Sequence, residues 1–285
     1  MRQIRLGAVA YLNARPLVFG LDRSPRFALR YDVPSECARR LHEGAIDLGL
    51  IPSIEYVNDA GYRIVPDVAV ASRGPVASVA LFATRPVRDL RSIAMDTSSR
   101  TSAALVRVLC ARLFKIQPEI VAMAPDLHAM LRRYDAAVLI GDNALLLETG
   151  TLQLDPDTAV EPAATKEAAV ETRVEKVDLG EAWTTLTGMP FVWAFWAGRP
   201  AALTAEEACA LQEARDEGVR HPDAIARSYF PGSPERQALA ARYLRDNIKY
   251  YLGAEERAAL EQFYRYAAEG GVVSRTEILR FYEQV

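Results

Sequence analysis

The chain has 285 residues, half of them hydrophobic and a quarter charged, which is the balance of an ordinary soluble globular protein with one large or two smaller domains. A net charge of -3 offers no positive field to nucleic acid, and no run of about 18 apolar residues predicts a membrane span. The three cysteines have neither disulfide nor zinc spacing, and residues 1–17 are too polar for a signal peptide. We therefore expect a cytoplasmic protein that binds neither nucleic acid nor membranes.

The first half of the chain alternates short apolar segments with helical patterns. Strands are expected at 4–11, 47–51 and 76–86, and again in the segments RSIAM, from Arg91, and DAAVLIG, from Asp135. Helical spacing of apolar residues follows most of them. This alternation predicts an α/β fold with mixed, largely parallel sheets.

The second half is less uniform. Residues 150–177 are polar and poorly patterned, and fit either a long hairpin or a loop, whereas residues 189–198 form a strongly apolar strand. After Pro200 the pattern is helical, and Thr204 with Glu207 predicts a capping box. We expect a helical C-terminal segment, whose amphipathic helices offer a surface for a homodimer.

Four strand-to-helix junctions share one design. Each places polar side chains directly after an apolar strand: Asn13, Ser53, Ser98 with Ser99, and Asp142 with Asn143. In parallel sheets such junctions lie at the carboxyl ends of the strands, where open α/β folds bind ligands. Helix N-termini there present free N–H groups and a partial positive charge. The sequence therefore predicts a site for a small anion.

The densest junction is residues 97–102, TSSRTS, where five of six side chains are hydroxyls. One helix cap needs only one such side chain, so we interpret this cluster as the lining of an anion-binding helix start. For each of the other junctions, considered alone, helix capping is a simpler interpretation than ligand binding. Arg100 fits a surface charge, a salt bridge or a ligand contact.

Other chemistry is scarce. His42, His128 and His221 are isolated and lack metal-ligand spacing. The sequence has no G-x-G-x-x-G, Walker A or G-x-S-x-G motif. The residues alone therefore predict a two-lobed α/β protein that binds a small anion, with no cofactor and no metal.

Five segments in order sharpen this prediction. They are GAVAYLNARPL, DLGLIPSIEY, DTSSRTSAALVRVL, AAVLIGDNAL and DLGEAWTTLTGMPFVWAFWA. Together they resemble the chorismate dehydratases, the first enzymes of the futalosine route to menaquinone, over most of residues 4–198.

The resemblance implies the two-lobed fold of type II periplasmic binding proteins. Residues 1–84 and the helical segment 197–285 would form lobe one, and residues 85–196 would form lobe two. The chain would then cross between the lobes near 84–87 and near 195–198.

The resemblance also implies a lyase that needs no metal or redox cofactor. Chorismate is a dicarboxylate; loss of its ring proton at position 3 and its hydroxyl at position 4 as water gives 3-[(1-carboxyvinyl)oxy]benzoate. A positioned side chain would normally take such a proton, but no histidine lies in the five segments. The substrate's enolpyruvyl carboxylate lies near that proton, so substrate-assisted proton removal is our hypothesis.

On this basis Asn13 is the catalytic candidate, because its amide can hydrogen-bond the departing hydroxyl or the reacting carboxylate. Asp142 is, apart from Asp96, the one acid of the junctions, and we expect it to cap a helix. The residues expected to bind chorismate are Ser53, Ser78, Ser98, Ser99, Arg100, Thr101, Ser102, Gly141, Asp142 and Asn143.

Two alternatives stay open. One is the related 1,4-dihydroxy-6-naphthoate synthase of the same pathway, although Gly141 and Asp142 stand where that family carries a histidine. The other is a solute-binding or sensor protein that uses the same fold without chemistry, because a fold alone does not define a function.

Overall fold

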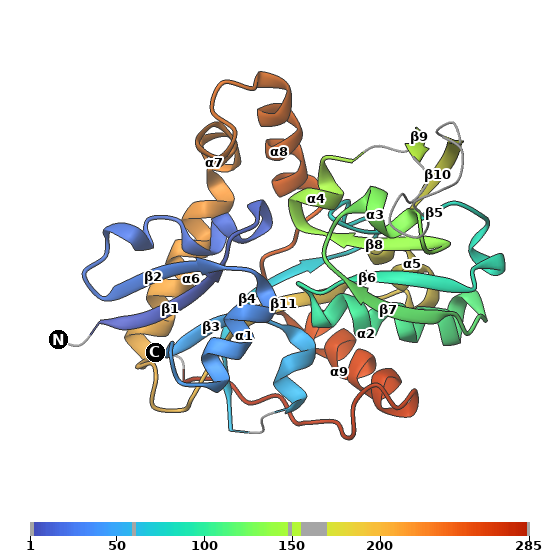
Figure 1. The fold of residues 1–285 in the computed structure, drawn as a ribbon. Coiled ribbons are helices and arrows are strands. Elements are labelled where there is room, and N and C mark those ends of the chain that lie inside the picture. Colours follow the sequence, from blue (N-terminus) through green and yellow to red (C-terminus); the bar gives the residue numbers. More distant parts are fainter. Residues whose placement is uncertain (1–2, 59–60, 148–149, 155–169, 284–285) are drawn as a thin grey trace.

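The computed structural model describes residues 3–58, 61–147, 150–154 and 170–283. Within these residues two β-sheets lie side by side, with helices packed against both (Figure 1). The expected α/β class with mixed sheets is confirmed. The sheets are not largely parallel as predicted, because four of the described strand pairs are parallel and five are antiparallel.

The first sheet has the spatial order β2 (Phe27–Asp32), β1 (Ile4–Val9), β3 (Leu48–Pro52), β11 (Phe191–Gly198) and β4 (Arg63–Ser72). β1 is parallel to both β2 and β3, whereas β11 is antiparallel to β3 and β4. A strand from late in the chain therefore lies between two early ones.

The second sheet has the order β7 (Glu119–Met123), β6 (Ser92–Asp96), β8 (Ala136–Ile140), β5 (Val79–Ala83), β10 (Val170–Asp178) and β9 (Gly150–Leu154). β6 is parallel to β7 and β8, and the pairs that involve β5 or β10 are antiparallel. β9 and β10 form the arms of the hairpin that was one alternative for 150–177, and residues 155–169 lie outside the described residues.

Helices connect and cover the strands. Those of the first two thirds are η1 (Leu12–Val18), η2 (Leu21–Arg23), α1 (Pro34–His42), η3 (Ser53–Asn58), η4 (Val87–Asp89), α2 (Arg100–Leu109), η5 (Cys110–Phe114), α3 (Leu127–Leu131), α4 (Gly141–Leu145) and α5 (Leu179–Thr187). The C-terminal ones are α6 (Ala205–Arg220), α7 (Pro222–Tyr229), α8 (Pro234–Asp246) and α9 (Ala254–Glu269). The capping box of Thr204 and Glu207 is present at the start of α6, as predicted.

The chain passes between the sheets at other positions than we expected. We placed the crossings near 84–87 and 195–198, but sheet membership changes between β4 and β5, at 73–78, and between β10 and β11, at 179–190. β5 and β11 are continuous buried apolar runs, and such runs carry no sign of which sheet they join. We therefore propose lobe boundaries within 73–78 and 179–190.

Asp178 ties the two crossings together. Its carboxylate accepts hydrogen bonds from the backbone N–H groups of Val76 at 3.0 Å and Ala77 at 2.6 Å in the first crossing. It also caps α5, accepting from Gly180 N at 2.9 Å and Glu181 N at 3.1 Å. One side chain therefore fixes the two connections relative to each other, and with them the relation between the sheets.

The C-terminal helices pack on both halves of the molecule. α6 lies against η1 and β4, and Gly218 approaches Pro16 so closely that a Cβ there would lie 2.2 Å from the proline carbonyl oxygen. α9 lies at the junction of the halves, against β11 and α2 (Figure 1). The segment 197–285 thus covers the first sheet and also reaches the second.

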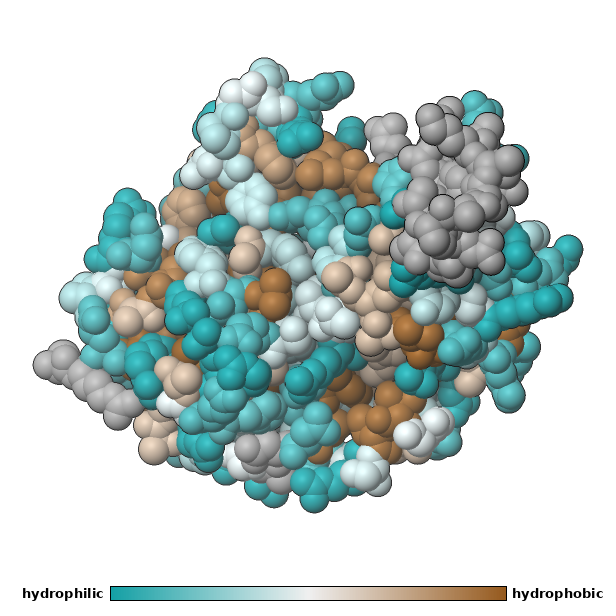
Figure 2. Space-filling model, viewed as in Figure 1, coloured by the Kyte–Doolittle hydropathy of each residue, from teal (hydrophilic) through white to brown (hydrophobic). Residues whose placement is uncertain are grey.

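The surface is mixed in character. Figure 2 shows hydrophilic residues over most of the face drawn, with hydrophobic residues in separate groups. Among the described helices, none combines the length and the apolar character that a bilayer crossing requires.

Candidate active site

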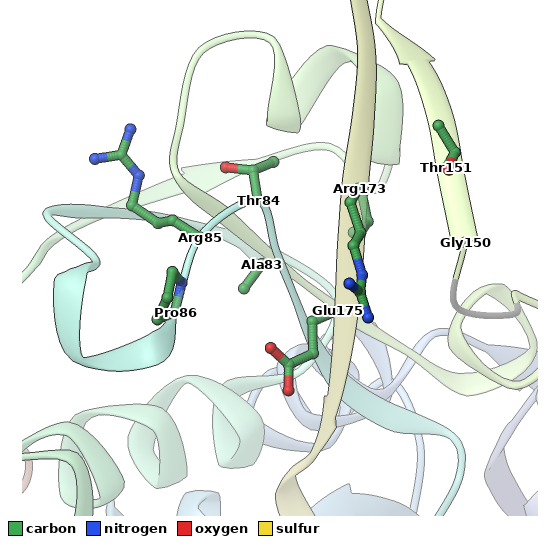
Figure 3. Close-up of a pocket in the computed structure, with 9 residues that line it drawn as sticks. Ala83, Thr84, Arg85, Pro86, Gly150, Thr151, Arg173 and Glu175 are labelled. Carbon is green, nitrogen blue, oxygen red and sulfur yellow. The ribbon is translucent and has the colours of Figure 1, made fainter.

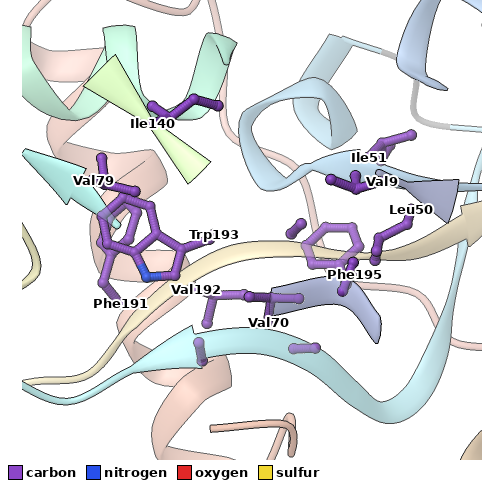
Figure 4. Close-up of a cluster of buried hydrophobic side chains, with 14 of the residues drawn as sticks. Val9, Leu50, Ile51, Val70, Val79, Ile140, Phe191, Val192, Trp193 and Phe195 are labelled. Carbon is purple, nitrogen blue, oxygen red and sulfur yellow. The ribbon is translucent and has the colours of Figure 1, made fainter. Parts of the chain in front are cut away.

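A small cavity lies where the two sheets meet. Val9, Leu50 and Val70 line it from the first sheet, and Val79 and Ile140 line it from the second. Figure 4 shows these side chains gathered along β11. The remaining lining residues are Tyr11, Asn13, Ala14, Pro34, Pro52, Ser99, Ser102, Gly141, Trp193 and Ala194.

The cavity is small for a ligand site. It encloses about 50 Å³, whereas sites for small organic ligands usually enclose roughly 300–1,000 Å³. The arrangement is therefore that of a closed cleft. A ligand with a ring and two carboxylates needs more room than this cavity encloses.

η1 carries Asn13 into the cavity wall directly after β1. The Asn13 side chain lies beside the hydroxyl of Tyr243, which donates to Ser78 Oγ at 2.6 Å. Burial raises the pKa of Tyr243, so this hydroxyl stays protonated at neutral pH. α8 thereby places the Tyr243 hydroxyl next to the Asn13 amide.

The first turn of α2 presents two hydroxyls to the cavity. Ser99 is the N-cap; its Oγ accepts from Ser102 N at 3.3 Å and lies 3.0 Å from Ser102 Oγ. The first N–H groups of a helix lack intrahelical acceptors, and the helix carries a partial positive charge at this end. Capping and an anion-binding wall therefore coexist at this junction.

The other hydroxyls of the 97–102 cluster that we proposed for binding contact the protein. Ser98 Oγ donates to Asp96 at 2.5 Å and accepts from the Tyr11 hydroxyl at 3.2 Å. Thr101 Oγ1 accepts from Ile54 N at 3.2 Å. These bonds fix the loop that places Ser99 and the start of α2.

Gly141 and Asp142 follow β8, and they have different roles in the structure. Gly141 lines the cavity with a φ of 61°, and Asp142 lies behind it. Asp142 Oδ1 accepts from Leu12 N at 3.1 Å, and its Oδ2 accepts from the hydroxyl of Tyr229. Burial raises the pKa of Asp142, and these two hydrogen bonds oppose that rise. The expected cap role is wrong, because Asp142 makes no cap bond to α4 and instead links the second sheet to η1 and α7.

Four further candidates lie outside the cavity lining. Ser53 donates to a β11 carbonyl at 2.8 Å, and Ser78 accepts from α8. Arg100 pairs with a buried carboxylate of η3, and Asn143 is exposed. Of the predicted residues, the structure brings together Asn13, Ser99, Ser102 and Gly141.

Sequence reasoning missed four aromatic residues at the site. Tyr11 and Trp193 line the cavity, and Tyr229 and Tyr243 approach it from the C-terminal helices. Tyr11 stands two residues before Asn13, at the end of a strand, and this position was the available signal. The two helical tyrosines lie on inward-facing sides of amphipathic helices, where nothing in the pattern indicates hydrogen bonds to Asp142 and Ser78 beside the cavity.

A wider groove lies at the far edge of the second sheet (Figure 3). It encloses about 660 Å³ between the end of β5, with Thr84 and Arg85, and the strands β9 and β10, with Arg173 and Glu175. Arg85 is paired with Asp135 at 3.0 Å. The described residues that line this groove include no strand-to-helix junction of the kind described above, so the smaller cavity is the candidate active site.

Metal ligands and histidines do not gather at the site. Within the described ranges, no three His, Cys, Asp or Glu side chains are grouped as a metal ion would need. The described residues that line the cavity include no histidine. The arrangement offers hydroxyls, an amide and helix N–H groups, which are ligands for an anion.

Sequence comparisons identify the relatives. The model of a family described as menaquinone biosynthesis matches residues 4–269. A chorismate dehydratase from Thermus thermophilus is 33% identical in an alignment of length 272 that covers 92% of this chain and 94% of that protein.

Solved structures share the fold at low identity. A protein from Archaeoglobus fulgidus superposes with a TM-score of 0.71 at 17% identity, covering 95% of this chain and 98% of that one. The periplasmic aliphatic sulphonate binding protein of Escherichia coli gives a TM-score of 0.56 at 18% identity, with 96% and 94% covered. These likenesses confirm the expected periplasmic-binding-protein type of fold. Since the family match spans nearly the whole length, the chain belongs to the menaquinone biosynthesis family.

Proposed function

We propose that this chain is a chorismate dehydratase, a lyase that removes water from chorismate. The observation that carries the proposal is the cavity itself, where a helix N-terminus with two serines faces an asparagine and apolar walls. That set suits a carboxylate on a ring. Membership of the family and the Thermus relative support the same reaction class.

The chemistry asks little of the protein beyond placement. Removal of the proton at ring position 3 and the hydroxyl at position 4 makes the ring aromatic, which drives the elimination. The proton is acidified by conjugation to the ring carboxylate. Because the substrate is neither oxidised nor reduced overall, the reaction needs no redox cofactor, and we propose that no metal takes part either.

Each wall has a proposed role. The N–H groups at the start of α2, with the hydroxyls of Ser99 and Ser102, hold one carboxylate. Asn13 hydrogen-bonds the departing hydroxyl or the reacting carboxylate, and Gly141 borders the ring. The apolar side chains exclude water, which strengthens these polar contacts.

Among the described residues that line the cavity, none is an acid or a histidine that could act as a base. Asp142 is held by Leu12 and Tyr229, Asp96 accepts from Ser98 through Oδ1, and neither carboxylate lines the cavity. We therefore propose that the enolpyruvyl carboxylate of chorismate takes the ring proton itself. Placement of the two carboxylates is then the main contribution of the enzyme.

A binding protein of the same fold is the alternative from another class. The experiment mixes purified, chelator-treated protein with chorismate, adds no cofactor, and follows products by mass and ultraviolet absorbance. A product lighter by one water with a benzoate-like spectrum supports the dehydratase. If chorismate is unchanged but raises the melting temperature of the protein, a binding protein is favoured. If chorismate is neither converted nor bound, both functions are contradicted.

A further inference from the structure

One ion pair crosses between the two halves of the molecule. Glu55 lies in η3, which connects two strands of the first sheet, and Arg100 is the first residue of α2, which follows β6 of the second. Arg100 Nη1 lies 3.0 Å and 2.9 Å from the two carboxylate oxygens of Glu55. The Glu55 side chain is 2% exposed and that of Arg100 is 51% exposed.

Glu55 is also held from its own side. His42 Nε2 lies 3.1 Å from Glu55 Oε2, and His42 Nδ1 lies 2.8 Å from the hydroxyl of Tyr62. Both partners belong to the first half of the molecule, so the carboxylate is fixed there. The guanidinium of Arg100 is the contact that reaches it from the second half.

A second link runs beside the ion pair. Thr101 Oγ1 accepts from Ile54 N at 3.2 Å and lies 3.4 Å from Ser53 Oγ. Residues 53–55 therefore meet the consecutive side chains of Arg100 and Thr101. The next helical residue, Ser102, and the cap Ser99 line the cavity.

We propose that Glu55 is a positioning residue that acts through Arg100: it holds the first turn of α2 against η3 and so keeps the cavity in its closed, reactive arrangement. Glu55 does not line the cavity, and neither does Arg100. The pair fixes where Ser99 and Ser102 stand relative to Asn13 across the cleft. The kinetic part of this inference rests on the proposed chorismate dehydration.

The kinetic test uses Glu55→Gln, Arg100→Gln and the double variant. Each single change is expected to lower kcat about tenfold, which corresponds to about 1.4 kcal/mol, with a smaller change in KM. Because both residues act through one contact, the double variant is expected to lose no more than the worse single variant. Arg100→Lys keeps the charge and is expected to recover part of kcat.

Asp47→Asn is the matched control. It removes a carboxylate that pairs with Arg5 at 2.8 Å entirely within the first half of the molecule, so kcat should stay within twofold of wild type. An unchanged kcat in Glu55→Gln would overturn the proposal. So would losses that multiply in the double variant, because they would show that Glu55 and Arg100 act separately.

A structural readout separates this inference from the proposed function. Small-angle scattering without substrate is expected to give a larger radius of gyration for Glu55→Gln than for wild type and for Asp47→Asn. If wild type does not convert chorismate, the function fails while this measurement still tests the link. An unchanged radius in Glu55→Gln means that Glu55 does not hold the halves together.

Discussion

The ring of Tyr11 lies directly against Gly141. A Cβ added to that glycine would stand 2.7 Å from three ring carbons, closer than nonbonded atoms approach, and the φ of 61° already disfavours any other residue. Tyr11 belongs to the first half of the cleft and Gly141 to the second. Their contact therefore sets how closely the two walls approach.

Gly141→Ala tests this contact. We expect kcat/KM for chorismate to fall at least about tenfold, since the methyl group displaces Tyr11 from the wall and the left-handed backbone adds roughly 1–2 kcal/mol. Gly44→Ala is the control, because Gly44 has a φ of 71° with no atom near its Cβ position. The Gly44→Ala variant has the unfavourable left-handed backbone but no steric clash, so it should be less stable than wild type with kcat/KM unchanged.

Asn13→Asp tests the proposed catalytic amide. A carboxylate at this position repels a dianionic substrate and cannot donate a hydrogen bond, so kcat should fall about 100-fold. Asn143→Asp makes the same change at the exposed asparagine of the fourth junction and should leave kcat unchanged. The measurement is steady-state kinetics of both variants. Unchanged turnover in Asn13→Asp would show that Asn13 has no catalytic role.

Much of this site follows from the sequence, for a physical reason. Strand-to-helix junctions are local: a polar residue shortly after an apolar strand is enough to place Asn13, Ser99 and the Gly141–Asp142 pair near helix starts, and strand polarity brings such starts to one edge. The sequence does not indicate which residues far apart in the chain contact each other. Nothing near Arg100 indicates that it meets Glu55, and nothing near Asp142 indicates Leu12.

The same limit explains the misplaced crossings. β5 and β11 are recognisable as buried strands from composition alone, yet each belongs to the sheet opposite to the one we assigned. Register with β8 or with β3 is decided by complementary packing across many residues, which no short window contains. The homodimer that the C-terminal helices suggest stays a prediction.

The acid stability of the protein should depend on Glu55. Burial raises the pKa of this carboxyl, but the hydrogen bond from His42 and the charge of Arg100 outweigh burial and hold it below its ordinary value of 4.5. A pKa lowered by folding adds stability above the unfolded value, and that stability is lost as the pH falls below it. Glu55→Gln should therefore be less stable than wild type at pH 7, by on the order of 1–2 kcal/mol.

Denaturant unfolding at several pH values measures this difference. The gap between wild type and Glu55→Gln should shrink steadily below about pH 4.5, because wild type then loses the charged contact that the variant never had. Glu36, whose pKa is lowered to about 2 by its hydrogen bonds from Arg39, is present in both proteins and cancels from the gap. A gap that stays constant down to pH 3 contradicts the assignment.

The cysteines should differ sharply in reactivity. Burial raises the pKa of Cys37 to about 12 and that of Cys110 to about 11, so both thiols stay protonated and covered at neutral pH. Cys209 in α6 is partly exposed. An aromatic disulfide reagent at pH 8 should release about one equivalent from the native protein and three after denaturation. Cys209→Ser should abolish the fast equivalent, and a remaining fast thiol would contradict the burial of the other two.

The position of β11 has a consequence for how the protein is made. β3 and β4 do not pair with each other but with the two sides of β11, so the first sheet stays open until residues 191–198 have left the ribosome. The second sheet uses one uninterrupted stretch, residues 79–178, and can close earlier. The half with the first sheet is therefore begun first, but the half with the second sheet can be completed first. Until then the nascent chain exposes two unpaired strand edges, the feature most prone to wrong pairing with a neighbour.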